Sequence, residues 1–320
     1  MPTTYKVIFY NVENLFDPAD DSKTTDEEFT PNGTNKYDDA RYQIHLEHTA
    51  KVLTSMLETE QPLFIGLSEI ENKRVLEDLV KTTSLHNYNL GIVHQESPDA
   101  RGIDVGLLYN KDLFTLISQE FITVKIADDA DFKTRDILHA KGTLKNGEII
   151  DVFVNHWPSR REGQVESEPR RIAAASILKA ATDKLLSANP NANILMMGDF
   201  NDYPTDKSIL NTLGATPVSA MNPGSKLYNI IQKPATGAIQ GSHFYNKEWG
   251  FLDQMMVSKA LLDGKKTDIM NKKAEVFYRD FMIYTNKEGI QAPNKFYVGS
   301  KYVGGYSDHF PICTSVSIAK

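Results

Sequence analysis

The most constraining feature of this sequence is a series of nine short apolar runs, six of which have a polar side chain capable of chemistry at or next to one end. The runs are too short for helices, and several are nearly all apolar, which is typical of central strands covered on both faces. We predict strands over Tyr5–Tyr10, Leu63–Ser68, Asn89–Val93, Val105–Tyr109, Leu138–Thr143, Ile149–Asn155, Asn193–Met197, Phe251–Val257 and Pro311–Ser317.

Helical periodicity separates some of these runs. We predict helices over Asp39–Glu58, Asn72–Ser84 and Glu168–Ser187. The third helix has Pro169 in its first turn, where proline is well tolerated. The first helix carries an apolar stripe made of Tyr42, Leu46, Ala50, Leu53 and Leu57. Because the strands are joined partly by hairpins and partly by helices, the pattern favours packed sheets with helices outside.

Two irregular segments interrupt this pattern. Residues 17–39 are acidic and rich in turn formers, and residues 265–305 contain many Tyr, Phe, Gly and Asn residues. Both adjoin candidate site residues, so they are either loops that frame a pocket or decorations without a role. We expect one domain over residues 1–320 with these two segments as insertions.

The charge balance limits the choice of partner. There are 42 acidic and 35 basic residues, a net charge of −7, whereas a protein that grips DNA mainly by neutralising phosphates is usually basic. Tight non-specific DNA binding is therefore not expected, but a phosphorylated substrate held in a local cationic pocket is compatible with this charge. The single cysteine, Cys313, excludes an intramolecular disulfide and a cysteine metal cluster.

Neither a leader nor a membrane span is expected. Met1 runs almost directly into the Tyr5–Tyr10 strand, which leaves no room for a basic segment followed by an apolar signal core. The longest apolar stretches are strand-sized. This favours the cytoplasm by default, or a secreted or periplasmic protein if a leader has been removed.

The polar residues at or next to the ends of six predicted strands are the candidate site. They are Asn11 and Glu13, Glu69, His156, Asp199 and Asn201, Asp253, and the pair Asp308 and His309. One such residue is usually a turn former or helix cap, but six coincidences suggest one cluster, since strand ends in a sheet converge. Clustered carboxylates repel one another unless a cation compensates. The oxygen-rich set suits Mg²⁺, Mn²⁺ or Ca²⁺ better than zinc.

The order of the motifs carries a family resemblance. In sequence they are Asn11-Val12-Glu13-Asn14, Ser68-Glu69, Asn155-His156-Trp157-Pro158-Ser159-Arg160-Arg161, Gly198-Asp199-Phe200-Asn201, Leu252-Asp253-Gln254 and Ser307-Asp308-His309. From about Tyr5 to Ser317 the chain resembles the endonuclease/exonuclease/phosphatase superfamily, which has the deoxyribonuclease I-like fold. Residues 10–16, 101–105 and 156–161 look most like a bacterial branch described only as nucleases or phosphatases.

The resemblance implies an α/β fold, a four-layer α/β/β/α sandwich of two packed, mainly antiparallel or mixed sheets with outer helices. It also implies a metal site, with Glu69 as the principal ligand and Asn11, Glu13 and Asp308 close to the cation or its waters. Asp199 and Asn201 would activate the attacking water and hold the phosphate. Asp253 would orient His309 toward the scissile phosphate.

Three further roles follow from the resemblance or from neighbouring residues. His156 would contact a phosphate oxygen or assist the leaving group, with Asp104 as its expected carboxylate partner. Arg135 matches an arginine that orients the site in several family members. Arg160 and Arg161 either clamp a second phosphate or belong to a solvated loop. His243 is a candidate pocket residue, and the nearby aromatic side chains form either a substrate wall or core: Phe244, Tyr245 and Trp249.

We therefore expect a divalent-metal-dependent phosphoester hydrolase, best described as a phosphodiesterase or nuclease. A phosphomonoesterase acting on an inositol phosphate or similar small molecule is the first alternative. A non-catalytic module that binds a phosphorylated ligand is disfavoured because every core group is present. A calcium-binding structural domain would rest on Asp17–Glu28, which lacks the EF-hand pattern. No amphipathic segment supports membrane docking.

Overall fold

Alternate side chains of the first strand, β1 (Thr3–Leu15), enter different cores, which shows how the layers form. Ile8 and Tyr10 belong to a core with the helices α1 and α2, whereas Val7 and Phe9 belong to a core with the opposite sheet. Side chains alternate along a strand, so a strand that is apolar on both faces must be covered on both. The sequence prediction of buried central strands is confirmed.

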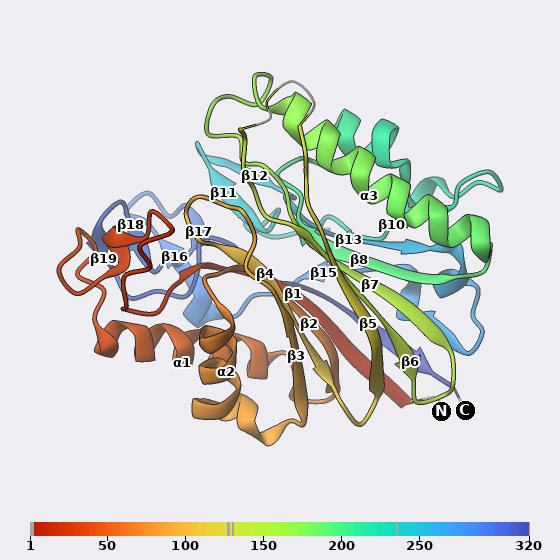
Figure 1. Cartoon of the computed structure of the whole chain (residues 1–320), viewed down its shortest axis with the longest axis horizontal. Coiled ribbons are helices and arrows are strands. Elements are labelled where there is room, and N and C mark those ends of the chain that lie inside the picture. Colours follow the sequence, from red (N-terminus) through yellow and green to blue (C-terminus); the bar gives the residue numbers. More distant parts are fainter. Residues whose placement is uncertain (1–2, 127–128, 130, 235, 320) are drawn as a thin grey trace.

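The computed structural model describes residues 3–126, 129, 131–234 and 236–319. Among these residues, two seven-stranded mixed sheets pack face to face. The first sheet has the order β14-β20-β1-β2-β4-β3, with β15 also paired to β20; the second has the order β5-β6-β7-β8-β13-β10-β9. Helices α1 (Asp39–Ser55) and α2 (Lys73–Thr82) cover the first sheet, and α3 (Glu168–Ala188) covers the second (Figure 1). The fold is thus the expected four-layer α/β/β/α sandwich.

The remaining elements of the described chain have the following bounds. The strands are β2 (Gln61–Ile70), β3 (Leu90–His94), β4 (Asp104–Asn110), β5 (Phe114–Ile122), β6 (Ile137–Leu144), β7 (Ile149–His156), β8 (Asn193–Asp199), β9 (Ala215–Pro217), β10 (Leu227–Asn229), β11 (His243–Tyr245), β12 (Glu248–Gly250), β13 (Asp253–Ser258), β14 (Thr267–Ile269), β15 (Glu275–Val276), β16 (Ile283–Thr285), β17 (Gln291–Pro293), β18 (Tyr297–Val298), β19 (Lys301–Tyr302) and β20 (Ile312–Ile318). Short helices are η1 (Glu27–Phe29), η2 (Ser84–Asn87), η3 (Ser208–Leu213), η4 (Val218–Ala220), η5 (Lys259–Leu262), η6 (Met270–Lys272) and η7 (Asp280–Met282).

All nine predicted strands and all three predicted helices are present, with boundary shifts of a few residues. Asn72, predicted as the first residue of α2, is its cap, since its side chain accepts a hydrogen bond from the Val75 amide at 3.0 Å. Strand β5 was not predicted, because it is an edge strand with mostly exposed side chains and lacks an apolar run. The predicted stripe of α1, from Tyr42 to Leu57, is buried.

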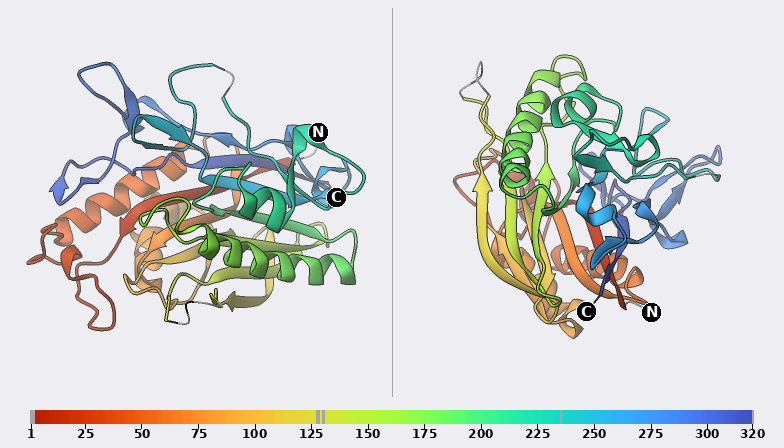
Figure 2. Two further views of the ribbon diagram at one scale, coloured as in Figure 1. Left: turned by 90° about the horizontal axis from the view of Figure 1, so that it is seen from above. Right: turned by 90° about the vertical axis from the view of Figure 1, so that its right-hand side faces the viewer.

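The two ends of the chain meet in the first sheet. Strand β1 pairs antiparallel with β20, from Thr3 opposite Ile318 to Phe9 opposite Ile312, and both termini lie side by side in each view (Figure 2). Because β1 runs away from the termini and β20 returns to them, residues after Phe9 and before Ile312 lie at the same end of the sandwich. Asn11 and His309 are brought together in this way.

The two irregular segments lie against each other at that end. The Tyr297 hydroxyl donates to the Asn35 carbonyl at 3.0 Å, and the ring of Phe296 stacks on His45 of α1 at 3.9 Å. Segment 17–25 lines a cavity of about 750 Å³ together with Glu71 and Asn72. No helix in the described parts of the chain is both long enough and apolar enough to cross a membrane.

Candidate active site

Strand pairing brings the predicted residues to one end of the two sheets. In the second sheet, Asp199 at the end of β8 lies opposite His156 of β7 on one side and Asp253 of β13 on the other. In the first sheet, Asn11 of β1 lies opposite Ser68 of β2. The site is therefore assembled across the interface between the sheets, from residues that are up to several hundred positions apart in sequence.

Irregularities in two strands direct the side chains of the first sheet. The β2–β4 ladder shifts register between Ser68 and Ile70, so that Glu69 forms a bulge with a φ of 65°. The β1–β2 ladder shifts between Asn11 and Leu15. Bulges reorient side chains at sheet ends, and a positive φ at a non-glycine residue costs energy that surrounding structure must supply. Neither irregularity was predicted from the sequence.

Asn11 links the two sheets through its amide group. Its Nδ2 donates to the Asp199 Oδ2 at 3.1 Å and lies 3.4 Å from the Glu69 Oε1. The other Glu69 oxygen accepts a hydrogen bond from the Asn14 amide at 2.9 Å. Two carboxylates from different sheets are thus held within reach of one neutral side chain, close to each other and to His156.

The strongest pair in the site is formed by Asp253 and His309. His309 Nδ1 lies 2.7 Å from Asp253 Oδ2, and both side chains are buried. Burial opposes a charge on the imidazole, but the carboxylates of Asp253, Asp308 and Asp199 outweigh it and raise the pKa of His309 well above its usual value. The ring is therefore an imidazolium, with its Nε2 3.8 Å from Asp199 Oδ2.

His156 has the opposite charge state. Its Nε2 lies 3.6 Å from Asp199 Oδ2 and 4.0 Å from Glu69 Oε1. Burial, together with the charges of Arg135, Arg101 and His309, lowers the pKa of His156 well below its usual value, so this ring is neutral. The expected pairing of His156 with Asp104 is not formed. Asp104 Oδ2 instead lies 3.2 Å from His94 Nε2, and His156 Nδ1 has no hydrogen-bond partner among the described residues.

Asp199 lies between these two histidines. Burial raises the pKa of its carboxyl to about 6, although the His309 charge lowers it. Its Oδ1 accepts a hydrogen bond from the Asn201 amide at 3.0 Å, and the Asn201 side chain in turn donates to the Trp157 carbonyl at 2.9 Å. Asn201 thus holds the Asp199 carboxylate in place and connects it to the loop after β7.

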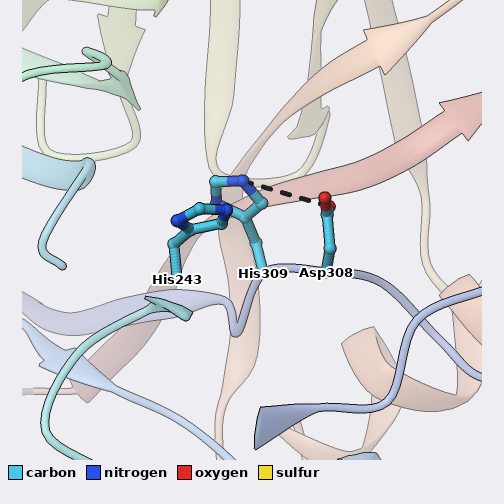
Figure 3. Close-up of side chains that lie close together, drawn as sticks. All are labelled: His243, Asp308 and His309. Atoms are coloured by element: carbon cyan, nitrogen blue, oxygen red, sulfur yellow. Dashed lines mark ion pairs between the residues drawn. The ribbon is translucent and has the colours of Figure 1, made fainter. Parts of the chain in front are cut away.

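Asp308 and His243 form the rim of the site on the His309 side, and Figure 3 shows the three side chains together. The His243 ring lies 4.6 Å from the His309 ring, and Asp308 Oδ1 lies 4.0 Å from His309 Nε2. Burial opposes ionisation of Asp308, but the His309 and Lys295 charges outweigh it and lower its pKa. Burial and the His309 charge lower the pKa of His243 to about 4.

Both carboxylate oxygens of Glu13 bind main-chain amides. They accept hydrogen bonds from the amides of Phe296 and Tyr297 at 2.7 and 2.8 Å. Burial and the nearby Asp308 raise the pKa of Glu13 well above its usual value. The structure therefore places Glu13 beside the site, but its side chain fastens segment 294–297, which carries Lys295, to β1.

The predicted arginines have three different environments. Arg135 is buried and donates to the carbonyls of His156 and Trp157 at 3.1 and 2.6 Å and to Asp99 at 3.0 Å. Arg160 is bound to the Asn201 carbonyl and to two carboxylates, which are Asp202 and Asp206. Only Arg161 is exposed, on the rim of a small cavity that Arg135 also lines.

The donor set fits a divalent cation that prefers oxygen ligands. Glu69 and Asp199 lie close together, one buried oxygen of Asp253 has no hydrogen-bond partner among the described residues, and Asp308 is partly exposed. Ligand atoms of Asp199, Asp253 and His309 lie within 4.8 Å of one another, as do those of His243, Asp308 and His309, but the charged His309 ring in both groups is not a metal ligand and neither group contains Glu69. Carboxylate and amide oxygens suit Mg²⁺ or Mn²⁺, and the clustered charge needs compensation.

Some supporting residues were not identified from the sequence. Ser307 donates to the Asn11 carbonyl at 2.7 Å and accepts from the His309 amide at 3.0 Å, so it joins β1 to His309. Lys295 lies 3.6 Å from Asp308. Asp99 anchors Arg135. Ser307 belongs to the recognised motif Ser307-Asp308-His309 but was given no role, whereas Lys295 and Asp99 lie in loops where no local pattern distinguishes them.

Comparison with known proteins agrees with this arrangement. Residues 6–319 match the model of the Endonuclease/Exonuclease/phosphatase family. The chain belongs to this family. Its members are metal-dependent phosphoesterases, so the chain is a phosphoester hydrolase, and the family resemblance predicted from the motifs is confirmed. No curated protein sequence matches the chain.

Solved structures of the family show the same fold at low identity. A family protein from Bacteroides thetaiotaomicron has a TM-score of 0.56 at 15% identity, covering 99% of this chain and 96% of that one. A mannosyl-6-phosphatase from the same organism has a TM-score of 0.57 at 15% identity, covering 98% and 100%. A humanized Danio rerio TDP2 has a TM-score of 0.58 at 15% identity, covering 98% and 99%. These likenesses establish the fold and leave the substrate open.

Proposed function

We propose that this family member is a phosphodiesterase of the nuclease type that uses Mg²⁺ or Mn²⁺. The observation that carries the proposal is Asp199, a buried carboxylate between a neutral histidine and a charged one. Phosphodiester hydrolysis needs a base for the attacking water and positive charge at the phosphate oxygens. His309 would supply positive charge on one side of that base, and His156 would supply a neutral hydrogen-bond donor on the other.

The metal would be held by Glu69, Asn11 and Asp308, and when bound it would supply positive charge to the phosphate and acidify a water molecule. Asp199 would accept the proton of the attacking water, because its carboxyl is held in place by the Asn201 amide and is ionised above a pH of about 6. Glu13 would act indirectly, by fixing the segment that carries Lys295.

The two histidines would contact the phosphate. His309, charged and oriented by Asp253, would donate from Nε2 to a phosphate oxygen as negative charge develops there. His156, which is neutral, would donate a hydrogen bond to another phosphate oxygen without adding charge. Arg135 would keep His156 in position, since its guanidinium holds the carbonyls of His156 and Trp157.

Hydrolysis of a substrate panel in Mg²⁺, Mn²⁺, Ca²⁺ or EDTA tests the proposal. The panel contains plasmid DNA, RNA, bis-p-nitrophenyl phosphate, p-nitrophenyl phosphate and inositol phosphates. We expect metal-dependent cleavage of diesters and a loss of at least about a thousandfold in kcat for Asp199→Asn and His309→Ala. Matched controls are Asp112→Asn and His86→Ala, which change exposed residues far from the site.

Each alternative has its own result in this assay. Faster cleavage of monoesters than of diesters would replace the phosphodiesterase proposal with a phosphomonoesterase. Full activity in Asp199→Asn or His309→Ala would disprove the assigned roles. Metal binding by folded protein without turnover of any substrate would favour a module that binds phosphorylated ligands.

A further inference from the structure

We propose that a small basic cavity beside His156 binds a second phosphate group of the substrate. This inference rests on the proposed function, because it concerns the substrate of the same site. The cavity has a volume of about 220 Å³ and is lined by five cationic side chains, which are Arg101, Lys133, Arg135, Arg161 and Arg170. Pockets for drug-sized ligands are larger, about 300–1,000 Å³, so this one suits a single anionic group.

The cavity carries a local excess of positive charge. Two acidic residues, Asp99 and Glu162, also line it. Arg170 is paired with Glu162 at 2.8 Å and with Asp129 at 3.0 Å. Counting five cations against these three carboxylates leaves a net charge of +2 (5 − 3), on a protein whose net charge is −7. Such a reversal attracts an anion to this place and not to the surface at large.

The excess charge resides on identifiable side chains. Arg135 is bound to Asp99, and Arg101 Nε lies 3.7 Å from the same carboxylate, so the two arginines share one negative partner. Lys133 and Arg161 are exposed and form no ion pair within the described parts of the chain. Guanidinium groups bind phosphate bidentately, and an ammonium group adds a point charge. The rim therefore offers donors for one phosphate.

The cavity is linked to the candidate active site through Arg135 and through the loop that follows His156. Arg135 lines the cavity and holds the carbonyls of His156 and Trp157, and the chain continues from His156 through Pro158 and Ser159 to Arg161 at the rim. A substrate whose scissile phosphate contacts His156 can therefore place another phosphate near Arg161. Arg160 is excluded from this role because its guanidinium already binds Asp202 and Asp206.

The ligand is defined by its chemistry as a second phosphate. It is either a neighbouring phosphate of a polynucleotide or another phosphate on a small molecule. Arg161→Gln and Lys133→Gln test this, because both residues are exposed and form no ion pair with another described residue, so their replacement leaves the core untouched. The matched control is Lys81→Gln, which removes one exposed positive charge from α2 on the opposite side of the molecule (Figure 1).

The first measurement is binding without turnover. Pyrophosphate is titrated calorimetrically into the protein in EDTA, and into the Glu69→Ala variant to exclude residual metal. We expect both to bind pyrophosphate, and we expect Arg161→Gln and Lys133→Gln each to raise its Kd about tenfold, while Lys81→Gln leaves it unchanged. Absence of binding to the wild-type protein, or equal binding by all variants, would overturn the proposal.

The second measurement compares substrates with one and two phosphates. The dinucleotide TpT is compared with pTpT and TpTp, and inositol 1-phosphate is compared with inositol 1,4-bisphosphate. A rise in kcat/KM within one set shows whether the second phosphate belongs to a polynucleotide or to a small molecule. We expect the added phosphate to raise kcat/KM about tenfold. We expect the two variants to abolish this gain without affecting hydrolysis of bis-p-nitrophenyl phosphate.

Equal losses of kcat/KM on all substrates, or no loss on any, would overturn the subsite but leave the phosphodiesterase proposal intact. If no substrate reacts but the binding pattern holds, the proposed function fails and the subsite stands.

Discussion

At the scale of single residues, the candidate site shifts the pKa values of two buried histidines in opposite directions. His309 has three carboxylates around it, whereas His156 has two arginines and His309 among its charged neighbours. Burial lowers the pKa of both rings, so the charged neighbours decide which ring keeps its proton. The same residue type can then serve as a cation on one side of Asp199 and as a neutral donor on the other.

Replacing Asp253 with asparagine tests this separation. Asparagine can still accept a hydrogen bond from His309 but carries no charge, so the pKa of His309 should fall. We expect kcat to drop about 10²- to 10⁴-fold, with the loss growing as the pH rises and His309 loses its proton. Proton NMR titration of His309 in the wild type and the variant, beside pH profiles of kcat, measures both effects. An unchanged His309 titration would contradict the explanation.

His45 gives a prediction for stability. It is fully buried, lies 3.1 Å from the Tyr37 hydroxyl and 2.9 Å from the Val12 carbonyl, and burial lowers its pKa to about 3. Between about pH 6.5 and pH 3 the unfolded chain binds a proton at this residue that the folded chain does not. The free energy of unfolding therefore falls as pH falls, by about 1.4 kcal/mol per pH unit from this residue.

The variant His45→Gln should lack this contribution. It loses packing against Phe296, so we expect it to be less stable than the wild type at pH 7.5. The difference in the free energy of unfolding should then shrink as the pH is lowered from 6.5 to 4.5, measured by urea unfolding at each pH. A difference independent of pH would show that His45 titrates normally in the folded protein.

At the scale of elements, the spacing of strands β7 and β8 depends on Gly198, where the two backbones approach each other closely. A Cβ atom at Gly198 would lie 2.4 Å from the Asn155 carbonyl oxygen and 2.7 Å from the Asn155 Cβ. Neither atom belongs to a flexible side-chain end, so the strands would have to separate. His156 and Asp199 lie one position further along these strands and face each other in the ladder.

We expect Gly198→Ala to destabilise the fold by about 1–3 kcal/mol and to reduce kcat at least tenfold, because the two strands position His156 and Asp199, the proposed base. Gly66→Ala is the matched control, since its Cβ would meet the flexible Met197 side chain, with Sδ at 2.8 Å. Thermal unfolding and kcat on bis-p-nitrophenyl phosphate are measured for both. If Gly66→Ala were as harmful as Gly198→Ala, close backbone approach would not be the cause.

At the scale of the whole molecule, the sandwich has three apolar layers and one polar end. One core lies between α1, α2 and the first sheet, a second between the sheets and a third under α3. Carboxylates from both sheets meet at the polar end, where their mutual repulsion opposes the packing of the sheets. A bound cation would therefore stabilise the entire fold and not only the site.

Metal binding should raise the temperature of unfolding. A ligand present at a hundred times its Kd stabilises the folded state by about 2.7 kcal/mol, so Mg²⁺ or Mn²⁺ should raise Tm by several degrees in differential scanning calorimetry. The shift should be lost in Glu69→Ala and kept in Glu58→Ala, a change at an exposed glutamate near the end of α1. A shift of equal size in both variants would indicate non-specific ion binding.

The sequence by itself determined nine of the strands, the three α-helices and the identity of the candidate site residues. Apolar runs of strand length and one helical stripe were sufficient for β1, β2, β8 and α1, because those segments bury what their own pattern makes apolar. The motifs ending in Asp199 and His309 were sufficient to indicate the family. Such information is local or lies in motif order, and neither depends on how the sheets pack.

Only the tertiary structure decided the partners and charge states. Contacts between segments distant in sequence pair Asp104 with His94 and let Glu13 hold Phe296 and Tyr297. Such contacts also bind Arg160 to carboxylates while Arg161 stays exposed. A pKa likewise depends on which charges surround a buried ring, and residue type alone does not give that. Local pattern selects the elements, but long-range packing sets the distances on which electrostatics and catalysis depend.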